Sequence, residues 1–183
     1  YYAQYTQGPL KTADYRYNDI YSALAQAVVD TPNADKVYTA DYLAGVQSAL
    51  DNNVQPGLPA SQQQAVNDAT QALANAISDP QYINYTIRFL NGDQVISTSN
   101  TYHYDDVVQT PATNPNKEST AAKVYEFSGW DPAVTRVTQD QDYVAQFNES
   151  DRYYTVTYNY HGGTSTEAVK YGDTAQNPPT VNR

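Results

Sequence analysis

The first 80 residues carry hydrophobic side chains at steps of three and four, which is the period of an amphipathic helix. One helix is expected after Asp14, because an apolar stripe begins there and continues until Thr31-Pro32 breaks it. The side chains predicted to share the inner face of this helix are Tyr17, Ile20, Tyr21, Leu24 and Val28.

Two more helices are predicted in the same region. The hydroxyl of Thr39 suits the N-cap of a second helix, which ends at Asn52-Asn53. Ser61 and Gln64 have the spacing of a capping box and predict the start of a third helix, which ends before Pro80. The expected inner faces are Leu43, Val46 and Leu50 in the second helix, and Val66, Ala69, Leu73, Ala76 and Ile77 in the third. The pattern therefore predicts a three-helix module over residues 9–80.

After Pro80 the hydrophobic period becomes two, which is typical of a β-strand. Tyr85, Ile87 and Phe89 alternate with polar residues and lead into Asn91-Gly92, a dipeptide that favours a tight hairpin turn. The strands expected next are a return strand, with Val95-Ile96 and Thr101–Tyr104, and a closing strand over Val144–Phe147. A small antiparallel or mixed sheet is therefore predicted over residues 81–150, so that the chain as a whole is α+β.

The sequence also contains an internal repeat. Residues 85–89, Tyr-Thr-Ile-Arg-Phe, match residues 154–158, Tyr-Thr-Val-Thr-Tyr, and a glycine turn follows each of them. The spacing Tyr-x-Asp-x-x-Gln-x-Pro begins at Tyr104 and again at Tyr171, an offset of 171 − 104 = 67 residues. Residues 151–183 are therefore expected to be the first half of a second copy, partly mobile or paired with another chain.

A shorter likeness links the start of the chain to the closing strand. Tyr2–Tyr5 resembles Val144–Phe147, so residues 1–8 are expected to be the closing strand of a preceding copy. This interpretation predicts that the N-terminal strand of one molecule pairs with residues 153–171 of another.

Composition and charge exclude several classes of protein. The 183 residues include 20 acidic and 10 basic side chains, and a net charge of −10 opposes binding to the phosphates of nucleic acid. The absence of cysteine excludes a disulfide framework and Cys-ligated metals. No apolar run reaches the roughly 18–20 residues of a membrane helix, so membrane insertion is not expected. The 19 tyrosines and a surface rich in Asn, Gln, Thr and Ser favour an extracellular location.

Residues 82–148 resemble the Listeria–Bacteroides repeat family, which includes the internalin B-repeats. The resemblance is carried by Tyr85–Phe89, Asn91-Gly92, Tyr125–Asp131 and Ala145–Phe147, and the Phe-x-Gly-Trp-Asp element is its most specific part. It implies β-grasp-like modules, strung in tandem on Gram-positive surface proteins. The residues to which it gives a structural role are Tyr85, Phe89, Phe127, Gly129, Trp130 and Phe147. Residues 114–123 depart from the family, because a longer and more polar connection stands there.

Two further families resemble parts of the chain. Residues 38–78 are similar to the FIVAR type of helical module found beside such repeats. Mucin-binding repeats of lactobacilli, which are also β-grasp-like and rich in Thr and Tyr, are an alternative relative. These families imply attachment or spacing at a bacterial cell surface, with a host glycoprotein or glycan as a partner.

Tyrosine is the residue type to which we assign a candidate binding role, because its ring and polar tip make adaptable contacts with glycans. The candidates are Tyr102, Tyr104, Tyr160 and Tyr171, whereas Tyr85, Tyr154 and Tyr158 are expected to face inward. Trp130 is expected to anchor the core, with sugar stacking as the alternative.

No catalytic residue, metal site or cofactor is predicted. The two histidines are far apart, with His161 in a predicted turn, and the acidic spacings Asp105-Asp106 and Asp140-x-Asp142 are interpreted as solvated turns and not as calcium ligands. Lys123 and Lys170 suit an intramolecular isopeptide bond by residue type alone, and surface lysine is favoured. The expected function is a non-enzymatic stalk or adhesion module of a cell-surface protein. The alternatives are a direct mucin- or glycan-binding module and an accessory module of a surface polysaccharide enzyme.

Overall fold

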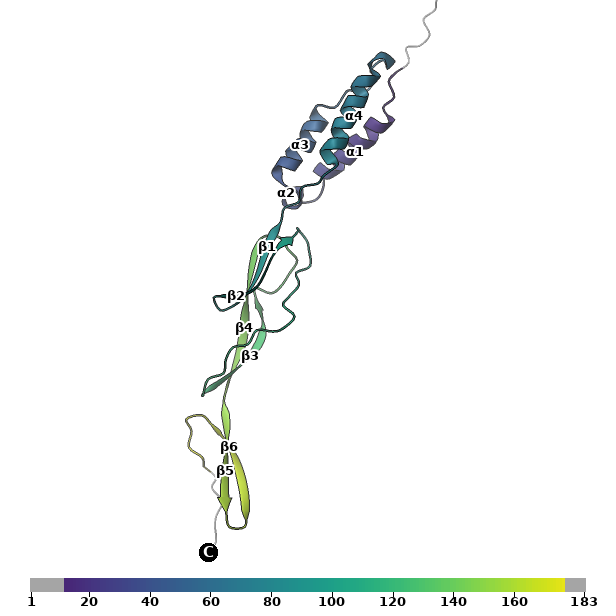
Figure 1. Ribbon diagram of the computed structural model, residues 1–183. Helices are drawn as coiled ribbons and strands as arrows, with labels where there is room; N and C mark the ends of the chain where they lie inside the picture. The colour runs from purple at the N-terminus through teal and green to yellow at the C-terminus, as the bar shows by residue number, and fades with distance from the viewer. Residues whose placement is uncertain (1–11, 177–183) are drawn as a thin grey trace, which may run out of the picture. The chain divides into compact units, whose positions relative to one another are not determined.

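The computed structural model describes residues 12–176, and the chain divides into two compact units between Asn84 and Tyr85. The first unit contains the helices and the second the strands (Figure 1), so the α+β class expected from the sequence is confirmed. The closing strand expected at residues 1–8 lies outside the described residues.

The helical unit consists of three long helices that contact one another: α1 (Arg16–Val29), α3 (Ala40–Asp51) and α4 (Gln63–Ile77). Figure 1 shows them side by side. Two short elements that the sequence pattern did not predict occupy the connections, α2 (Ala34–Val37) and the 3₁₀ turn η1 (Ala60–Gln62). The buried side chains of this unit's core cluster are Ala25, Tyr42, Val46 and Leu73.

The two predicted helix starts have different outcomes. The cap at Thr39 is confirmed, because its hydroxyl accepts the N–H of Tyr42 at 3.4 Å. The capping box at Ser61 is wrong. Ser61 lies inside η1, and Gln64 donates to Asp68 one turn further along α4 instead of reaching back to the helix start.

The predicted inner face of α1 is only partly right. Tyr21 and Val28 are half-buried and pack against the core cluster, as expected, but the other predicted residues are exposed. Tyr17 and Leu24 are 69% and 49% exposed, and the helix buries Asn18 and Ala25 instead. Ala25 has only a methyl group as its side chain, so it fills little volume in the interface with the neighbouring helices. The amide of Asn18 donates to Asn53 Oδ1 at 2.9 Å, and the amide of Asn53 donates back to Asn18 Oδ1 at 3.3 Å. This reciprocal pair satisfies a buried polar side chain, so the buried face is shifted around the helix from the apolar stripe.

The β unit contains a four-stranded mixed sheet in the order β2-β1-β4-β3, which is an arrangement of the expected β-grasp-like kind. Its strands are β1 (Tyr85–Asn91), β2 (Gln94–Tyr102), β3 (Lys123–Asp131) and β4 (Gln141–Asp151). The pairs β1–β2 and β3–β4 are antiparallel, whereas β1 and β4 pair in parallel at the centre. The strand leading into Asn91-Gly92 and the closing strand at Val144–Phe147 are confirmed, and the return strand ends at Tyr102.

A second, two-stranded sheet follows. It is the hairpin of β5 (Tyr153–Tyr160) and β6 (Gly163–Lys170), which pair in an unbroken register from Tyr153↔Lys170 to Tyr160↔Gly163. His161 and Gly162 form its turn, as the sequence pattern predicted.

The core of the β unit lies between the sheet and an irregular connection, residues 103–122, which joins β2 to β3. The buried side chains are Ile87, Phe89, Val108, Val137 and Tyr143. The connection is attached by two backbone hydrogen bonds, from Asp105 N–H to the Val137 carbonyl at 2.8 Å and from Val137 N–H to the Asp106 carbonyl at 3.0 Å. Val108 of the connection is thereby held against the sheet and completes the core. In the described part of the β unit, no helix packs there.

Candidate functional site

The aromatic signature residues gather on one face of the four-stranded sheet. Phe127 pairs with Phe147 and Gly129 with Gln146, so Ser128 is an extra residue in β3 and makes a bulge. In a regular strand without a bulge, residues three positions apart such as Phe127 and Trp130 would lie on opposite faces. Their ring centroids are instead 5.3 Å apart.

Trp130 packs against the core cluster as an anchor. Its ring meets that of Phe89 edge to face, with the centroids 4.7 Å apart, and Phe89 in turn stacks on Tyr143 at 5.2 Å. Gly129 makes this arrangement possible, because its φ of +143° is a backbone conformation that side chains other than glycine rarely adopt. The half-buried indole therefore completes a hydrophobic cluster.

The first two candidate binding tyrosines lie at the end of β2. Tyr102 is half-buried and packs against the core, and its hydroxyl accepts the N–H of Gln109 at 3.0 Å. Tyr104, two residues further along, is half-buried in the connection. Both rings are therefore partly covered, and the hydroxyl of Tyr102 has a structural role.

The other two candidates lie at opposite ends of the β5–β6 hairpin. Tyr160 precedes the turn, whereas Tyr171 follows the far end of β6 and is 52% exposed. The structure therefore does not bring the four candidates together. It places Tyr154 beside Tyr171, with ring centroids 6.1 Å apart, and Tyr154 is exposed where the alternation predicted an inward side chain. The hydroxyl of Tyr154 donates to the carbonyl of Ala121 at 3.0 Å, so it holds β5 against the segment that precedes β3.

A network of charges links the four-stranded sheet to the hairpin. We call it the Asp151 junction, and it consists of Lys123, Glu149, Asp151, Arg152 and Lys170. The carboxylate of Asp151 accepts from Lys170 at 2.7 Å and from Lys123 at 3.0 Å, and Lys123 also reaches Glu149 at 2.8 Å. These hydrogen bonds, that of Lys170 foremost, lower the pKa of Asp151, and the two carboxylates raise the pKa of Lys123.

The backbone reinforces the same junction at Arg152. Its N–H donates to the Ala122 carbonyl at 2.9 Å, its guanidinium donates to the Thr120 carbonyl at 3.0 Å, and its own carbonyl accepts the N–H of Tyr171 at 3.0 Å. The sequence pattern did not single out this junction, because its partners lie on three separate segments, residues 120–123, 149–152 and 170–171. Lys123 and Lys170, the two lysines that suit an isopeptide bond by residue type, both bind carboxylates.

A second polar cluster lies where β1 meets β4. The guanidinium of Arg88 holds Asp142 through two parallel hydrogen bonds, one of them 2.6 Å long, and this contact lowers the pKa of Asp142. The side chain of Asp140 accepts the N–H of Thr86 at 2.8 Å. The prediction of a solvated acidic turn at residues 140–142 is therefore wrong, since both carboxylates bind groups of β1.

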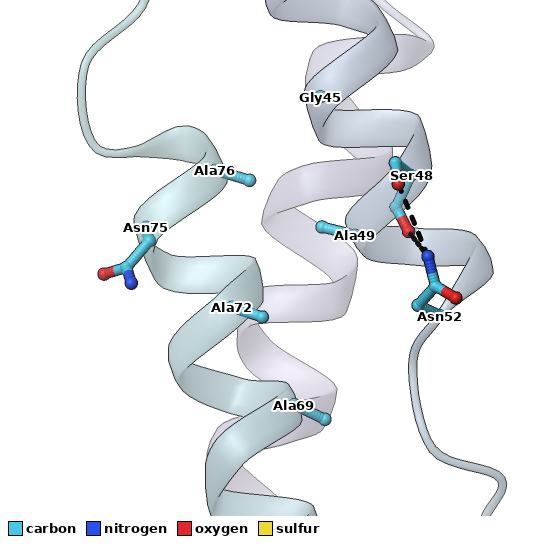
Figure 2. A pocket seen from close by; sticks show the side chains of 8 residues that line it. All are labelled: Gly45, Ser48, Ala49, Asn52, Ala69, Ala72, Asn75 and Ala76. Atoms are coloured by element: carbon cyan, nitrogen blue, oxygen red, sulfur yellow. Dashed lines mark hydrogen bonds between the residues drawn. The ribbon is translucent and has the colours of Figure 1, made fainter.

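An open groove of about 480 Å³ runs between α3 and α4. Ala69, Ala72 and Ala76 point from α4 toward α3, and Ala49 points back from α3 (Figure 2). At one end of the groove the side-chain amide of Asn52 donates to the Ser48 carbonyl at 2.7 Å. This polar group at the rim of the groove therefore already has a partner in its own segment. The groove is thus shallow and lined by small side chains, with few polar groups directed into it.

Within residues 12–176, no group of three or more His, Cys, Asp or Glu is arranged to hold a metal ion. None of the described helices is both long and apolar enough to cross a membrane. No protein-family model matches the chain, and neither a curated protein nor a solved structure matches it.

Proposed function

We propose that this chain is a non-catalytic stalk or adhesion module of a bacterial cell-surface protein, which spaces or presents a binding surface toward a host or a matrix. The observation that carries the proposal is a repeated β unit whose copies are joined by the Asp151 junction. A stalk needs modules that repeat one fold and joints that restrict bending. The repeated hairpin and the Asp151 junction are the features of this chain that correspond to these two needs.

The repetition extends to individual backbone groups. Asp105 and Gly172, at the offset of 67 residues, both have positive φ, +67° and +87°. Each lies in a turn closed by equivalent hydrogen bonds, from Asp106 N–H to the His103 carbonyl at 3.2 Å and from Asp173 N–H to the Lys170 carbonyl at 3.0 Å. The turn after the hairpin therefore has the same local structure in both copies.

The same equivalence holds for the next anchoring contact. In the first copy the N–H of Gln109 donates to the hydroxyl of Tyr102, and in the second the N–H of Gln176 donates to the carboxylate of Glu167 at 3.0 Å. A side chain of the return strand thus holds the following segment in each copy, although the residue type differs and Glu167 lies two positions before Val169, the counterpart of Tyr102. The internal repeat is accordingly a repeat of structure as well as of sequence.

The joint between the copies is short. β4 ends at Asp151 and β5 begins at Tyr153, so Arg152 alone separates them. With one linking residue and contacts on both sides of it, the hairpin has little freedom to turn about the end of the sheet. The resemblance to tandem surface repeats and the surface rich in uncharged polar residues support an extracellular location.

The stalk proposal can be tested by measuring the stiffness of this joint. The natural sequence contains no cysteine, so two spin labels can be attached at Glu126→Cys on β3 and Thr164→Cys on β6, both at exposed positions. Double electron–electron resonance then gives the distribution of distances between the labels. We expect a narrow distribution in the otherwise unchanged chain and a broader one in Asp151→Asn.

Asp93→Asn is the matched control, because it removes one carboxylate at an exposed turn outside the junction. It should leave the distribution narrow. A broad distribution in the unmodified joint would refute a stiff spacer.

A second candidate function, direct binding of mucin or host glycans, is favoured by the adjacent exposed rings of Tyr154 and Tyr171. Saturable binding on a mucin and glycan array, lost in Tyr171→Ala and kept in Tyr17→Ala, would support it. Tyr17 is the control because it is an exposed tyrosine of the helical unit. Equal binding by both variants would show that this pair of rings is not the site.

A further inference from the structure

The two copies of the repeat differ at one edge. In the first copy β1 lies between two strands, with β2 antiparallel on one side and β4 parallel on the other. Its counterpart β5 has β6 on one side, and in the described part of the chain it pairs with no second strand. β5 therefore has the sequence and turn of a central strand, with one edge open.

The open edge of β5 corresponds to the edge of β1 that receives β4. The offset between the two strands is 154 − 85 = 69 residues, which makes Thr155, Thr157 and Asn159 the counterparts of Thr86, Arg88 and Leu90. The N–H of Thr86 points to the β4 side, where it donates to Asp140. Because hydrogen-bonding groups alternate along a strand, the amides of Thr155, Thr157 and Asn159 face away from β6.

The side chains of β5 show the same incompleteness. Ile87 and Phe89 are buried under the core of the first copy, whereas their counterparts Val156 and Tyr158 are only half-buried. In the first copy Phe89 stacks on Tyr143, which belongs to β4. The surface that β4 covers in one copy is thus partly exposed in the other.

Nothing in β5 blocks the addition of a strand. Native sheets protect their edges with proline, charged residues or bulges. β5 contains none of these, since residues 153–160 are uncharged, lack proline and pair with β6 without a register shift. The corresponding pair β1–β2 has two register shifts.

We propose that the open edge of β5 binds an extended segment of another polypeptide in parallel, in the register in which Gln141–Val144 of β4 pairs with Ile87–Leu90 of β1. Such β-augmentation takes its affinity from main-chain hydrogen bonds and its specificity from alternate side chains. The partner carries an aromatic residue at the position of Tyr143, to stack on Tyr158. It needs no acid at the position of Asp142, because the counterpart of Arg88 is the neutral Thr157.

The probe for this site is a synthetic peptide with the sequence of residues 138–148, which contains the pairing segment of β4. It is titrated to millimolar concentration into the ¹⁵N-labelled chain. We expect saturable shifts of the amide signals of residues 155–159. A paramagnetic label at the N-terminus of the peptide should broaden the signal of Thr155 more than that of Tyr160, because the strands are parallel.

Two variants of the chain form a matched pair, since Thr157 and Thr166 lie directly opposite each other in the hairpin. Thr157→Pro removes an N–H from the open edge of β5 and should abolish the shifts. Thr166→Pro removes an N–H from the outer edge of β6, which corresponds to the edge of β2 that the complete sheet also leaves free, and should retain them.

The peptide variant Tyr143→Ala tests the same site in the unchanged chain, so the result does not depend on how well a proline variant folds. It should bind about 3- to 10-fold more weakly, as expected for the loss of one aromatic contact. The proposal is overturned if no saturable shift appears at β5, if the label indicates an antiparallel strand, or if both proline variants respond alike. It is also overturned if the β5 signals shift with protein concentration alone, because the occupant is then a segment of a second copy of this chain. None of these outcomes depends on the stiffness of the Asp151 junction, so this proposal can fail without the stalk proposal.

Discussion

Replacing Gly129 by alanine should destabilise the β unit through its backbone alone. A Cβ built on Gly129 meets no atom within 4 Å, so the substitution causes no clash. Its cost arises from the φ of +143°, which is a strained conformation for any residue with a side chain. We expect a loss of about 1–3 kcal/mol in the free energy of unfolding.

Gly45→Ala provides the matched control, because this glycine also has open surroundings but lies inside α3 with helical geometry. Alanine loses less backbone entropy than glycine when a helix forms, so the helical unit should gain about 0.5–1 kcal/mol. The same chemical change therefore has opposite signs at the two positions. The difference depends only on the backbone.

The two units can be followed separately in one denaturation experiment. Trp130 is the only tryptophan of the sequence and lies in the β unit, whereas the helical far-UV circular dichroism arises from the first unit. Gly129→Ala should lower the fluorescence transition by about 4–8 °C per kcal/mol and leave the helical transition unchanged. An unchanged fluorescence transition would refute the role assigned to the bulge. A lower helical transition in Gly45→Ala would show that the groove between α3 and α4 does not have room for a methyl group.

Three further predictions concern the other features. Asn18→Ala should destabilise the helical unit by about 1–3 kcal/mol, because it leaves the amide of Asn53 without its partner. In chemical denaturation, the double variant Asn18→Ala/Asn53→Ala should lose less unfolding free energy than the two single variants together. Leu24→Gln should change stability by less than about 0.5 kcal/mol, whereas Ala25→Leu should cost about 1–3 kcal/mol by overpacking, and equal losses in thermal melts would contradict the face we assign to α1. The pKa of Asp151 is lowered in the folded chain, so its ion pairs persist above the ordinary aspartate pKa of 3.8 and are lost as the pH falls below it; the spin-label distances should broaden on acidification in the natural sequence and stay broad at every pH in Asp151→Asn.

Local signals in the sequence predicted the elements whose structure is decided locally. Thr39 caps its helix, and the predicted hairpin turn occurs one residue later than expected, at Gly92-Asp93, with a φ of +59° at the glycine. Both depend on contacts within a few residues. The inner face of α1 was only partly right, because its apolar arc is wider than the surface that the other helices cover. The reciprocal bonds of Asn18 with a residue 35 positions away help to decide which part of that arc is buried.

Features that depend on distant segments could not be predicted in this way. The sequence pattern left β3 unassigned, because the bulge at Ser128 breaks the alternation by which a strand is recognised. The parallel pairing of β1 with β4 and the partners of Asp151 have no local signature at all. Only the internal repeat carried long-range information, since it indicated that residues 154–173 would repeat the structure of an earlier segment.

The central parallel pair of the sheet also has a consequence for the order of events during synthesis. Arg88 and Asp142 are 54 positions apart, whereas the β1–β2 hairpin is closed by a two-residue turn. At about 5–20 residues per second, a ribosome needs roughly 3–11 seconds to make the chain between them, and a hairpin forms within about 1–10 microseconds. The β unit therefore spends seconds as a β1–β2 hairpin whose β4 edge is uncovered.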